Sequence, residues 1–356
     1  MKILITSPSL DTNKNVSGIS SITQFIITYN TKNSYLHFEL GRKDCQRRNL
    51  SWFINILHIY LKWPYVIFSQ KIDIIHFNLA LTKESILRDF PLIIMARIFR
   101  KSMILHLHGG EFLMHKKNPF WMNYLLKLIF VPNMPLIVLS PLEEKIIKNK
   151  SRNSNIYILP NCIDLKEAER YDHDHSNDEY FKFLFLGRIS SDKGLEFIYQ
   201  AMVSLKEKGL KYKFLLAGKG PEEEIFKKKF SDLLGVDFEF KGVVAGIQKT
   251  DLLKECDVFL LPSFYEGLPM ALLESMSFGL VPITTNVGSI GYVINDGVNG
   301  LFVKSHSSDD IVLAIEKLSK YKKYRHELGK NARQTIFTNF NPEHYISRLN
   351  KIYNYE

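Results

Sequence analysis

The pattern of apolar and polar positions predicts β-strands that alternate with helices in both halves of the chain. Short apolar runs rich in Ile, Leu, Val and Phe alternate with longer segments in which apolar residues recur at helical spacing. Such continuous runs are typical of strands that are buried on both faces of a parallel sheet. The strands expected in the first half are 2–7, 35–40, 73–77, 102–108, 136–139 and 156–159, with helices that include 21–29, 52–61 and 120–130.

The pattern restarts after a polar stretch at 166–180. The expected strands of the second half are 181–188, one ending near 216–218, 237–242, 257–262, 281–284 and 299–303. A final helix begins at Asn341-Pro342, a cap followed by an N1 proline, and carries an apolar stripe. A chain of 356 residues normally forms two domains or one large one. We therefore predict an α/β protein with domains 1–165 and 166–340.

The composition is typical of a folded protein without disulfides, structural zinc sites or membrane-spanning segments. The chain is 46% hydrophobic and 24% charged, and its cysteines Cys45, Cys162 and Cys256 are too scattered for a disulfide framework or zinc site. A reducing cytosol is the simplest setting, and 1–7 is interpreted as a strand and not a signal peptide. The longest apolar stretch, 52–68, is too short to span a bilayer and contains Pro64. A buried helix followed by a turn is expected there.

The charge is concentrated in the first half. Residues 1–165 hold 21 Lys and Arg against 10 Asp and Glu, whereas the remainder holds 26 against 27. This asymmetry predicts an anionic surface or acceptor that faces the first half. Nucleic acid is not expected, because no helix-turn-helix, zinc-finger or RNP-type pattern accompanies the basic residues. The run Asp-His-Asp-His at 172–175 contains metal-ligating residue types, but we interpret it as part of a solvated connector.

The most informative stretch is 263–279. Pro269 suits the start of a helix and Gly279 its end, so 263–268 is expected to form a loop after a buried strand. Ligands bind at such strand ends in open α/β sheets, and helix N-termini favour phosphate. Glu266 in the loop and Glu274 in the helix could hold hydroxyls on two sides of a nucleotide-sugar diphosphate. For the pair alone, a surface loop and an ordinary helical glutamate is the favoured interpretation.

The segment 266–282, EGLPMALLESMSFGLVP, resembles the signature of family 4 of the retaining glycosyltransferases. Ser275 and Ser277 replace the alanines usual in that family. The resemblance implies a GT-B fold, in which two Rossmann-like domains face each other across a cleft and the C-terminal helix 341–356 crosses back to the first domain. It also implies a nucleotide-diphosphate sugar as donor, retention of configuration at the transferred sugar, and no metal or other cofactor.

The resemblance assigns most site residues to the second half. Arg188 and Lys193 would hold the donor diphosphate, Glu266 the hydroxyls of the donor sugar and Glu274 the ribose. Two cations at a strand end can neutralise a leaving diphosphate without a metal ion, which agrees with this assignment. The other predicted substrate-binding residues of this half are Gly187, Gly218, Gly267, Leu268, Pro269 and Met270.

Two predicted site residues lie in the first half. His108, followed by two glycines, matches the family's strand-terminal histidine and is expected to face the donor sugar; a buried structural histidine is the alternative. Gly18 lies in a loop that carries only one of the two glycines usual in the family. His106 is expected to be packed inside, on the opposite face from His108, and His76 to be structural. The role of Glu111 is left open.

The resemblance thus implies a metal-independent, retaining hexosyltransferase, and we expect it to act on a glycan or polyprenyl-diphosphate-linked acceptor in bacterial surface polysaccharide synthesis. It is expected in the cytoplasm, peripherally bound to the inner face of the cell membrane and released by high salt. Alternatives are a nucleotide-sugar epimerase or sugar phosphorylase of the same fold, or a non-enzymatic membrane-associated binding protein. A nicotinamide-dependent dehydrogenase is not favoured, because the first strand leads to Ser-Pro-Ser and not to a glycine-rich fingerprint.

Overall fold

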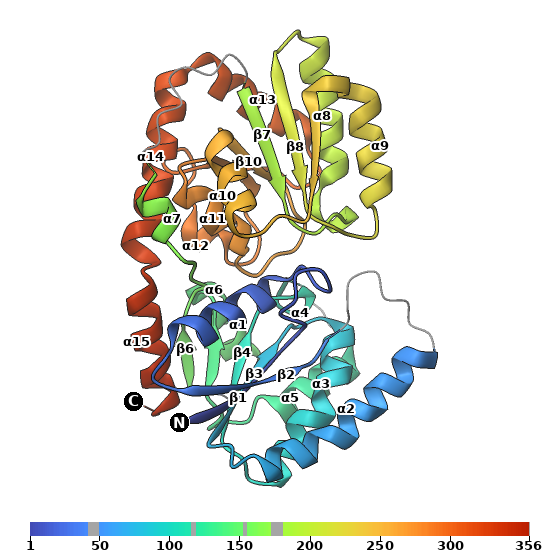
Figure 1. The fold of residues 1–356 in the computed structure, drawn as a ribbon, viewed down its shortest axis with the longest axis vertical. Helices are drawn as coiled ribbons and strands as arrows, with labels where there is room; N and C mark the ends of the chain where they lie inside the picture. The colour runs from blue at the N-terminus through green and yellow to red at the C-terminus, as the bar shows by residue number, and fades with distance from the viewer. Residues whose placement is uncertain (42–49, 115–118, 152–154, 172–180, 356) are drawn as a thin grey trace. The chain divides into compact units, whose positions relative to one another are not determined.

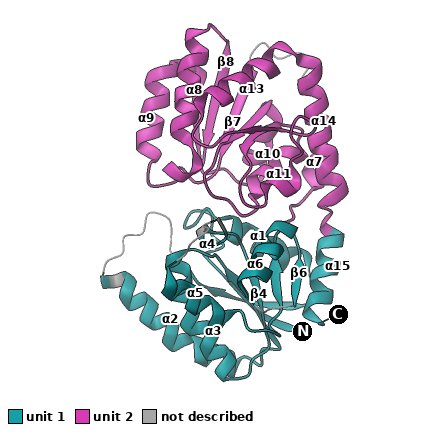
Figure 2. Cartoon of the chain, turned by 180° about the vertical axis from the view of Figure 1, so that it is seen from behind, with its two compact units in different colours: residues 1–161, 343–356 teal, residues 162–342 magenta. Residues whose placement is uncertain are grey.

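The chain forms two compact units, each built on a six-stranded parallel sheet (Figure 2). The computed structural model describes residues 1–41, 50–114, 119–151, 155–171 and 181–355. Unit 1 comprises Met1–Asn161 and Glu343–Glu356, and unit 2 comprises Cys162–Pro342. The division between the units falls four residues before the boundary expected from the sequence.

Unit 1 has the strand order β2-β1-β3-β4-β5-β6 (Figure 1). The order reverses between β1 and β3, so the chain departs in opposite directions from their carboxyl ends, which is where open α/β sheets bind ligands. The strands are β1 Lys2–Ser7, β2 Ser34–Glu39, β3 Ile74–Leu79, β4 Met103–Leu107, β5 Leu136–Val138 and β6 Ile156–Ile158.

Helices cover both faces of this sheet because alternate strand residues point to opposite sides. One face, including Phe77 and Leu105, shares a hydrophobic core with Trp63, Leu92 and Leu126 from three of the helices. The other face carries His76 and His106. The helices of unit 1 are α1 Gly18–Tyr29, α2 Leu50–Ser69, α3 Lys83–Ile98, α4 Glu111–Met114, α5 Phe120–Ile129, α6 Pro141–Lys150 and α15 Pro342–Tyr353.

The last helix, α15, packs against the first part of the chain. The Nδ2 of Asn30 donates a hydrogen bond to Asn350 Oδ1 at 2.9 Å, and the rings of Phe25 and Tyr345 meet edge to face. The Tyr353 hydroxyl lies 2.7 Å from His76 Nδ1. Unit 1 is therefore completed by a segment that follows the whole of unit 2 in the sequence.

The prediction that α2 ends in a turn at Pro64 was wrong. The helix runs through Pro64 to Ser69, although proline in a helix interior costs about 3 kcal/mol. Trp63 and Ile67 are fully buried beside it, and Trp63 Nε1 donates a hydrogen bond to the Leu92 carbonyl at 3.0 Å. Burial of two such side chains offsets a cost of this size. None of the helices within the described residues is long and apolar enough to cross a membrane.

Unit 2 has the strand order β12-β11-β10-β7-β8-β9, the doubly wound arrangement of dinucleotide-binding folds. Its switch point lies between β7 and β10, whose carboxyl ends precede the predicted donor loops. The strands are β7 Phe181–Leu186, β8 Tyr212–Ala217, β9 Phe238–Gly242, β10 Val258–Leu261, β11 Val281–Thr285 and β12 Leu301–Val303.

The helices of unit 2 flank this sheet (Figure 1). The two that bear on the site are α8, which follows β7, and α11, which follows β10. In chain order the helical elements are α7 Lys166–Glu169, η1 Ser191–Lys193, α8 Leu195–Glu207, α9 Glu223–Leu234, η2 Gly235–Asp237, α10 Gly246–Glu255, α11 Met270–Ser277, α12 Ile290–Val293, α13 Ser308–Lys320 and α14 Lys322–Asn339.

Candidate active site

The loops after β7 and β10 are locked together at the switch point of unit 2. The Phe264 amide donates a hydrogen bond to the Asp192 carbonyl at 2.8 Å. Gly194 has a φ of +75°, and a Cβ there would lie 2.2 Å from the Pro262 carbonyl oxygen. Only glycine allows this approach. The chain therefore holds the residues before Gly194 directly against the loop that carries Glu266.

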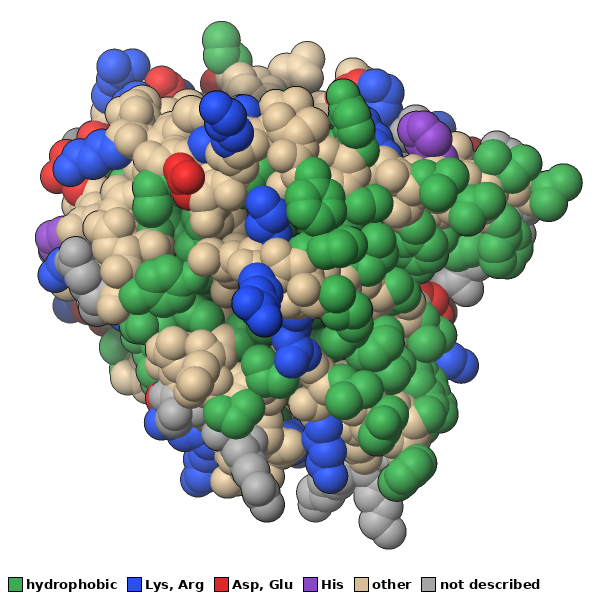
Figure 3. Space-filling view, turned by 90° about the horizontal axis from the view of Figure 1, so that it is seen from below, with side chains coloured by type: hydrophobic (Ala, Val, Ile, Leu, Met, Phe, Trp, Pro, Cys, Tyr) green, Lys and Arg blue, Asp and Glu red, His purple; other side chains and the backbone are tan. Residues whose placement is uncertain are grey.

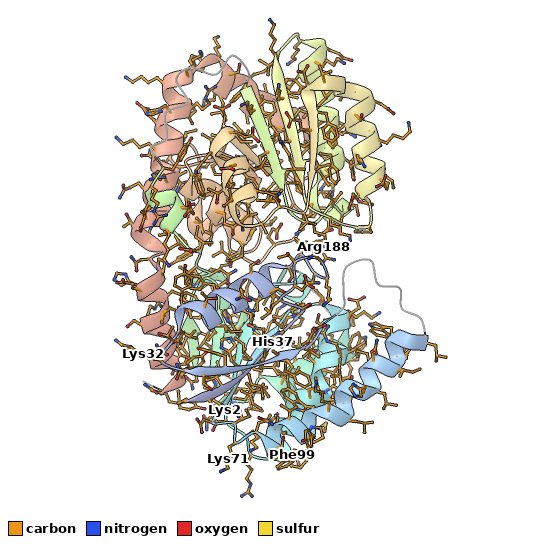
Figure 4. The ribbon with its side chains drawn as sticks, in the orientation of Figure 1. Lys2, Lys32, His37, Lys71, Phe99 and Arg188 are labelled. Atoms are coloured by element: carbon orange, nitrogen blue, oxygen red, sulfur yellow. The ribbon has the colours of Figure 1, made fainter. Side chains whose placement is uncertain are left out.

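Three predicted site residues meet at this point. Lys193 Nζ lies 2.8 Å from Glu266 Oε1, and their side chains are only 17% and 11% exposed. Burial alone would lower the pKa of Lys193, but the carboxylates of Glu266 and Asp192 outweigh burial and raise it, so Lys193 is charged at neutral pH. Arg188, beyond the end of β7 in Figure 4, is close enough for its charge to oppose that rise. The site therefore presents two cations, Arg188 and Lys193, and two carboxylates close to Lys193, Glu266 at 2.8 Å and Asp192 at 3.8 Å.

The ends of β7 and β8 approach each other through glycine backbone. Gly218 has a φ of +133°, and a Cβ there would lie 1.8 Å from the Gly187 carbonyl oxygen. A Cβ on Gly187 would meet only the Phe185 ring, at 3.8 Å, which is an ordinary contact. Glycine is therefore required at position 218, where any side chain would meet the Gly187 backbone. At position 187 the structure gives no such reason for a glycine.

We expect Gly218→Ala to destabilise unit 2 by about 3–5 kcal/mol, because it combines an unfavourable φ with a backbone clash. Gly209→Ala is the matched control: its φ is +74°, but nothing lies within 4 Å of its Cβ position. Strain alone there is expected to cost about 1–2 kcal/mol. Urea unfolding followed by circular dichroism measures both. Equal losses in the two variants would contradict the close approach of β7 and β8.

The Glu266 backbone is fixed from the far side by the loop after β11. The Ser289 amide donates a hydrogen bond to the Gly267 carbonyl at 2.9 Å. Gly288 has a φ of +57°, and a Cβ there would lie 2.0 Å from the Glu266 carbonyl oxygen. Leu268 of the same loop is buried. Glu266 is thus held by contacts on both sides of its loop.

Helix α11 begins at Met270, one residue later than predicted, with Pro269 in extended conformation as its N-cap. Its first amides have no side-chain cap, as expected of a helix start that binds an anion. The helix ends as predicted at Gly279, whose φ is +83° and whose amide donates to the Met276 carbonyl at 3.0 Å.

Ser275 and Ser277, the departures from the family signature, are buried on this helix without strain. Their hydroxyls donate hydrogen bonds to the helix carbonyls of Leu272, at 2.9 Å, and Glu274, at 2.7 Å. Each serine therefore satisfies its own polar group where the family has alanine.

Glu274 is separate from the Lys193–Glu266 pair. Its Oε1 lies 2.7 Å from Lys249 Nζ on α10, and both side chains are less than one-third exposed. Sequence reasoning missed Lys249, because nothing in the pattern of α10 distinguishes it from other helical lysines. Lys249 holds the carboxylate predicted to bind the ribose.

In unit 1, His108 is held by an amide that fixes its tautomer. Asn78 Nδ2 donates to the Thr6 carbonyl at 2.7 Å, so its Oδ1 must be the atom 2.6 Å from His108 Nε2. His108 Nε2 therefore carries the proton and Nδ1 a lone pair. Burial lowers the pKa of His108 to about 3, so the ring is neutral at pH 7. Sequence reasoning missed Asn78, although a polar residue at the end of a buried strand is a recognisable signal.

The prediction that His106 and His108 face opposite sides of the sheet was wrong. Residues two apart in a strand share a face, and the two rings lie 4.1 Å apart. His106 is fully buried, as expected, and its Nδ1 lies 3.1 Å from His76 Nε2. His76 continues to the Tyr353 hydroxyl, so a column of three imidazoles links α15 to His108. Burial lowers the pKa of His76 to about 4 and that of His106 well below its usual value.

For the other predicted residues the described part of the structure gives no contact that supports a role in the site. Gly18 is the first residue of α1, exposed and without a positive φ, and the Ser17 hydroxyl caps the helix by accepting from the Ile19 amide at 3.2 Å. Glu111 begins α4, but its side chain is outside the described part of the chain, as is the run 172–175. Among the residues that are described, no group of three or more His, Cys, Asp or Glu could hold a metal ion.

Comparison with known proteins shows the fold and the family that the chain resembles. Residues 167–335, nearly all of unit 2, match the model of the family described as glycosyl transferases group 1. The uncharacterized glycosyltransferase MJ1069 of Methanocaldococcus jannaschii is 28% identical over 84% of this chain and 79% of its own length. The chain is similar to the group 1 glycosyltransferases, most directly over unit 2.

Two further proteins are similar to the chain. The Campylobacter jejuni N,N'-diacetylbacillosaminyl-diphospho-undecaprenol alpha-1,3-N-acetylgalactosaminyltransferase is 28% identical over 54% of this chain and 50% of its own. The crystal structure of Anabaena Alr3699/HepE in complex with UDP-glucose covers all of both chains with a TM-score of 0.74 at 15% identity, a likeness of fold alone. The predicted GT-B fold, with two Rossmann-like units, is confirmed.

Proposed function

We propose that this glycosyltransferase moves a hexose from a nucleotide-diphosphate sugar to a lipid-linked glycan, with retention of configuration and without a metal ion. The observation that carries the proposal is the buried Lys193–Glu266 pair beside Arg188 at the switch point of unit 2. The names of the two proteins just described support the substrates: one acts on a diphospho-undecaprenol acceptor, and the other was crystallised with UDP-glucose. Synthesis of bacterial surface polysaccharide at the inner face of the cell membrane is the setting we propose.

The main chemical task of the site is to stabilise the leaving diphosphate. The bond between the anomeric carbon and the diphosphate oxygen breaks, and its electron pair stays on the diphosphate. An acceptor hydroxyl bonds to the same carbon, and its proton passes to a departing diphosphate oxygen. Lys193, Arg188 and the first amides of α11 would neutralise the charge that develops, which is the service a metal ion provides in other transferases. Glu266, already positioned by Lys193, would accept hydrogen bonds from donor-sugar hydroxyls.

His108 and Glu274 would take binding roles. The neutral imidazole of His108 offers an acceptor nitrogen, Nδ1, because its other nitrogen donates to Asn78. Glu274 would accept hydrogen bonds from the ribose hydroxyls while Lys249 balances its charge. Both groups would bind hydroxyls of the donor, and neither would take part in breaking the bond to the diphosphate.

The function is tested in two steps. Thermal unfolding with a panel of nucleotide-sugars identifies the donor, because a ligand that binds only the folded state raises the melting temperature. Transfer of that sugar to a polyprenyl-diphosphate glycan is then followed by NMR of the product's anomeric proton. Release of a modified free sugar without acceptor would indicate an epimerase, and a requirement for inorganic phosphate would indicate a phosphorylase. Inversion at the anomeric centre would contradict the retaining mechanism.

Activity is expected to be unchanged by EDTA, because Arg188, Lys193 and the α11 amides supply the positive charge. The measurement is the initial transfer rate before and after chelation, with re-addition of manganese. Loss of activity that manganese restores would overturn the metal-free mechanism. The run 172–175 would then be the first segment to mutate.

A further inference from the structure

Helix α2 of unit 1 is apolar on two sides. One side packs into the core through Trp63, Val66 and Ile67. The other forms a continuous outward row along the helix, in which every side chain is between 55% and 77% exposed. The members of this row are Leu50, Phe53, Ile54, Leu57, Leu61, Tyr65 and Phe68. Folded monomers rarely expose so long a row of large apolar side chains without a partner.

The end of α3 extends this row. Phe68 of α2 contacts Phe99, just after α3, with ring centroids 4.7 Å apart, and Ile98 beside them is 68% exposed. Figure 3 shows hydrophobic side chains gathered over this end of unit 1, with Lys and Arg among them. We call the α2 row together with Ile98 and Phe99 the apolar face.

The charged residues near the apolar face are mostly cationic. Lys71 and Arg100 are exposed in the turns that follow α2 and α3, and Figure 4 labels Lys71 and Phe99 at the same end of unit 1. Lys101 Nζ lies 5.5 Å from the centre of the Phe68 ring. Between residues 50 and 130 the sequence has ten Lys and Arg against four Asp and Glu. An apolar surface with a positive border is complementary to anionic headgroups above hydrocarbon.

We propose that the apolar face inserts into the surface of an anionic lipid bilayer, with α2 lying in the plane of the membrane. The helix is already fixed by its core-facing side, so insertion orders no new backbone. Its 20 residues extend for about 30 Å, and its outward row is suited to the boundary between headgroups and acyl chains. The inference deepens the membrane association in the proposed function by naming the surface, and it requires no catalytic activity.

Insertion and a purely electrostatic contact respond differently to salt. Between about 0.01 M and 1 M salt the Debye length falls from about 30 Å to about 3 Å, which screens Lys and Arg from headgroups. Burial of apolar side chains is not screened. The charge distribution alone predicts complete release by salt, whereas the apolar face predicts a bound fraction that only detergent removes.

The test is co-sedimentation of the full chain with vesicles of phosphatidylcholine, with or without phosphatidylglycerol, at both salt concentrations and without donor or acceptor. The double variant Leu57→Gln, Leu61→Gln changes two exposed positions of α2, keeps its helix-forming character and leaves its charge unchanged. It is expected to lower the salt-resistant partition about 100-fold, since each buried leucine contributes roughly tenfold. Leu313→Gln, at an equally exposed leucine of α13 in unit 2, is the matched control and should bind like the parent.

A second pair of variants separates charge from insertion. Lys71→Gln with Arg100→Gln should weaken binding to anionic vesicles at low salt and leave the salt-resistant fraction unchanged, whereas Lys330→Gln on α14 should change neither. Complete release of the parent by salt, or parent-like binding by the double leucine variant, would overturn the proposal. A parent protein that is dimeric in sedimentation velocity, with a monomeric leucine variant, would assign the face to a second copy instead. Because catalysis is not measured, failure here leaves the transferase assignment standing.

Discussion

Lys193→Ala is expected to lower turnover by about 10²–10³-fold while it loosens binding of the nucleotide-sugar far less. Removal of one preorganised electrostatic contact to a charge that develops in the transition state has an effect of this size. The pKa of Lys193 is raised by Glu266 and Asp192 despite burial, so the full charge is present at neutral pH. Steady-state kinetics separates the two effects, because loss of a transition-state contact lowers kcat more than it raises KM.

A surface ion pair of the same unit provides the control. Lys208 Nζ lies 2.7 Å from Glu316 Oε1, but both side chains are more than one-third exposed. Lys208→Ala should leave kcat within twofold, since exposed pairs contribute little. Glu266→Gln keeps the shape of the loop but removes its carboxylate, and it should lower kcat. The double variant Lys193→Ala, Glu266→Gln should not recover the kcat that Lys193→Ala loses. Turnover of Lys193→Ala within twofold of the parent would exclude the proposed role.

Unit 1 is expected to lose stability steeply as the pH falls below about 6.5. The folded-state pKa of His76 is about 4, because burial disfavours its charged form, whereas the unfolded chain binds a proton near the ordinary value of 6.5. Stability is therefore complete above that value. Below it the unfolded state gains protons that the folded state does not, which costs about 1.4 kcal/mol per pH unit for each such histidine. Burial shifts His106 and His108 in the same direction.

The measurement is urea unfolding of the full chain at several pH values between about pH 7 and pH 4.5, with the unit 1 transition followed separately. His76→Phe removes one titrating group and should make the dependence on pH shallower, even where it lowers stability at neutral pH. His326→Gln, on α14 of unit 2, is the control, because it removes a histidine outside unit 1. A slope that is the same in His76→Phe as in the parent would contradict the neutral histidine column.

Much of the fold follows from local pattern. Apolar runs predicted the strands because buried parallel strands must be apolar on both faces. The roles of Arg188, Lys193 and Glu266 came from the resemblance to a known family and stay predictions; what the structure adds is that Lys193 and Glu266 form an ion pair. Pro269 was displaced by one position because extended backbone suits it as well as the first helical turn does.

The partners of these residues could not be predicted in the same way. Asn78 meets His108 because β3 and β4 pair in a register that only the folded sheet defines. Lys249 meets Glu274 through the packing of two helices. The apolar pattern of α2 could not reveal its exposure, because a helix that is apolar on all sides is typical both of a buried element and of one that binds a surface. The prediction of a helix end at Pro64 was wrong because packing of α2 into the core outweighs the low helix propensity of proline.

The position of α15 has a consequence for the order in which this protein folds during synthesis. Every residue of unit 2 leaves the ribosome before Tyr345, Asn350 and Tyr353, which cover the α1 side of unit 1. Unit 2 is therefore the first to be complete, although its sequence comes second, and until then the buried face around His76 lacks its last helix. A released chain truncated after Pro342 should show a protease-resistant unit 2 beside a unit 1 that is cleaved readily.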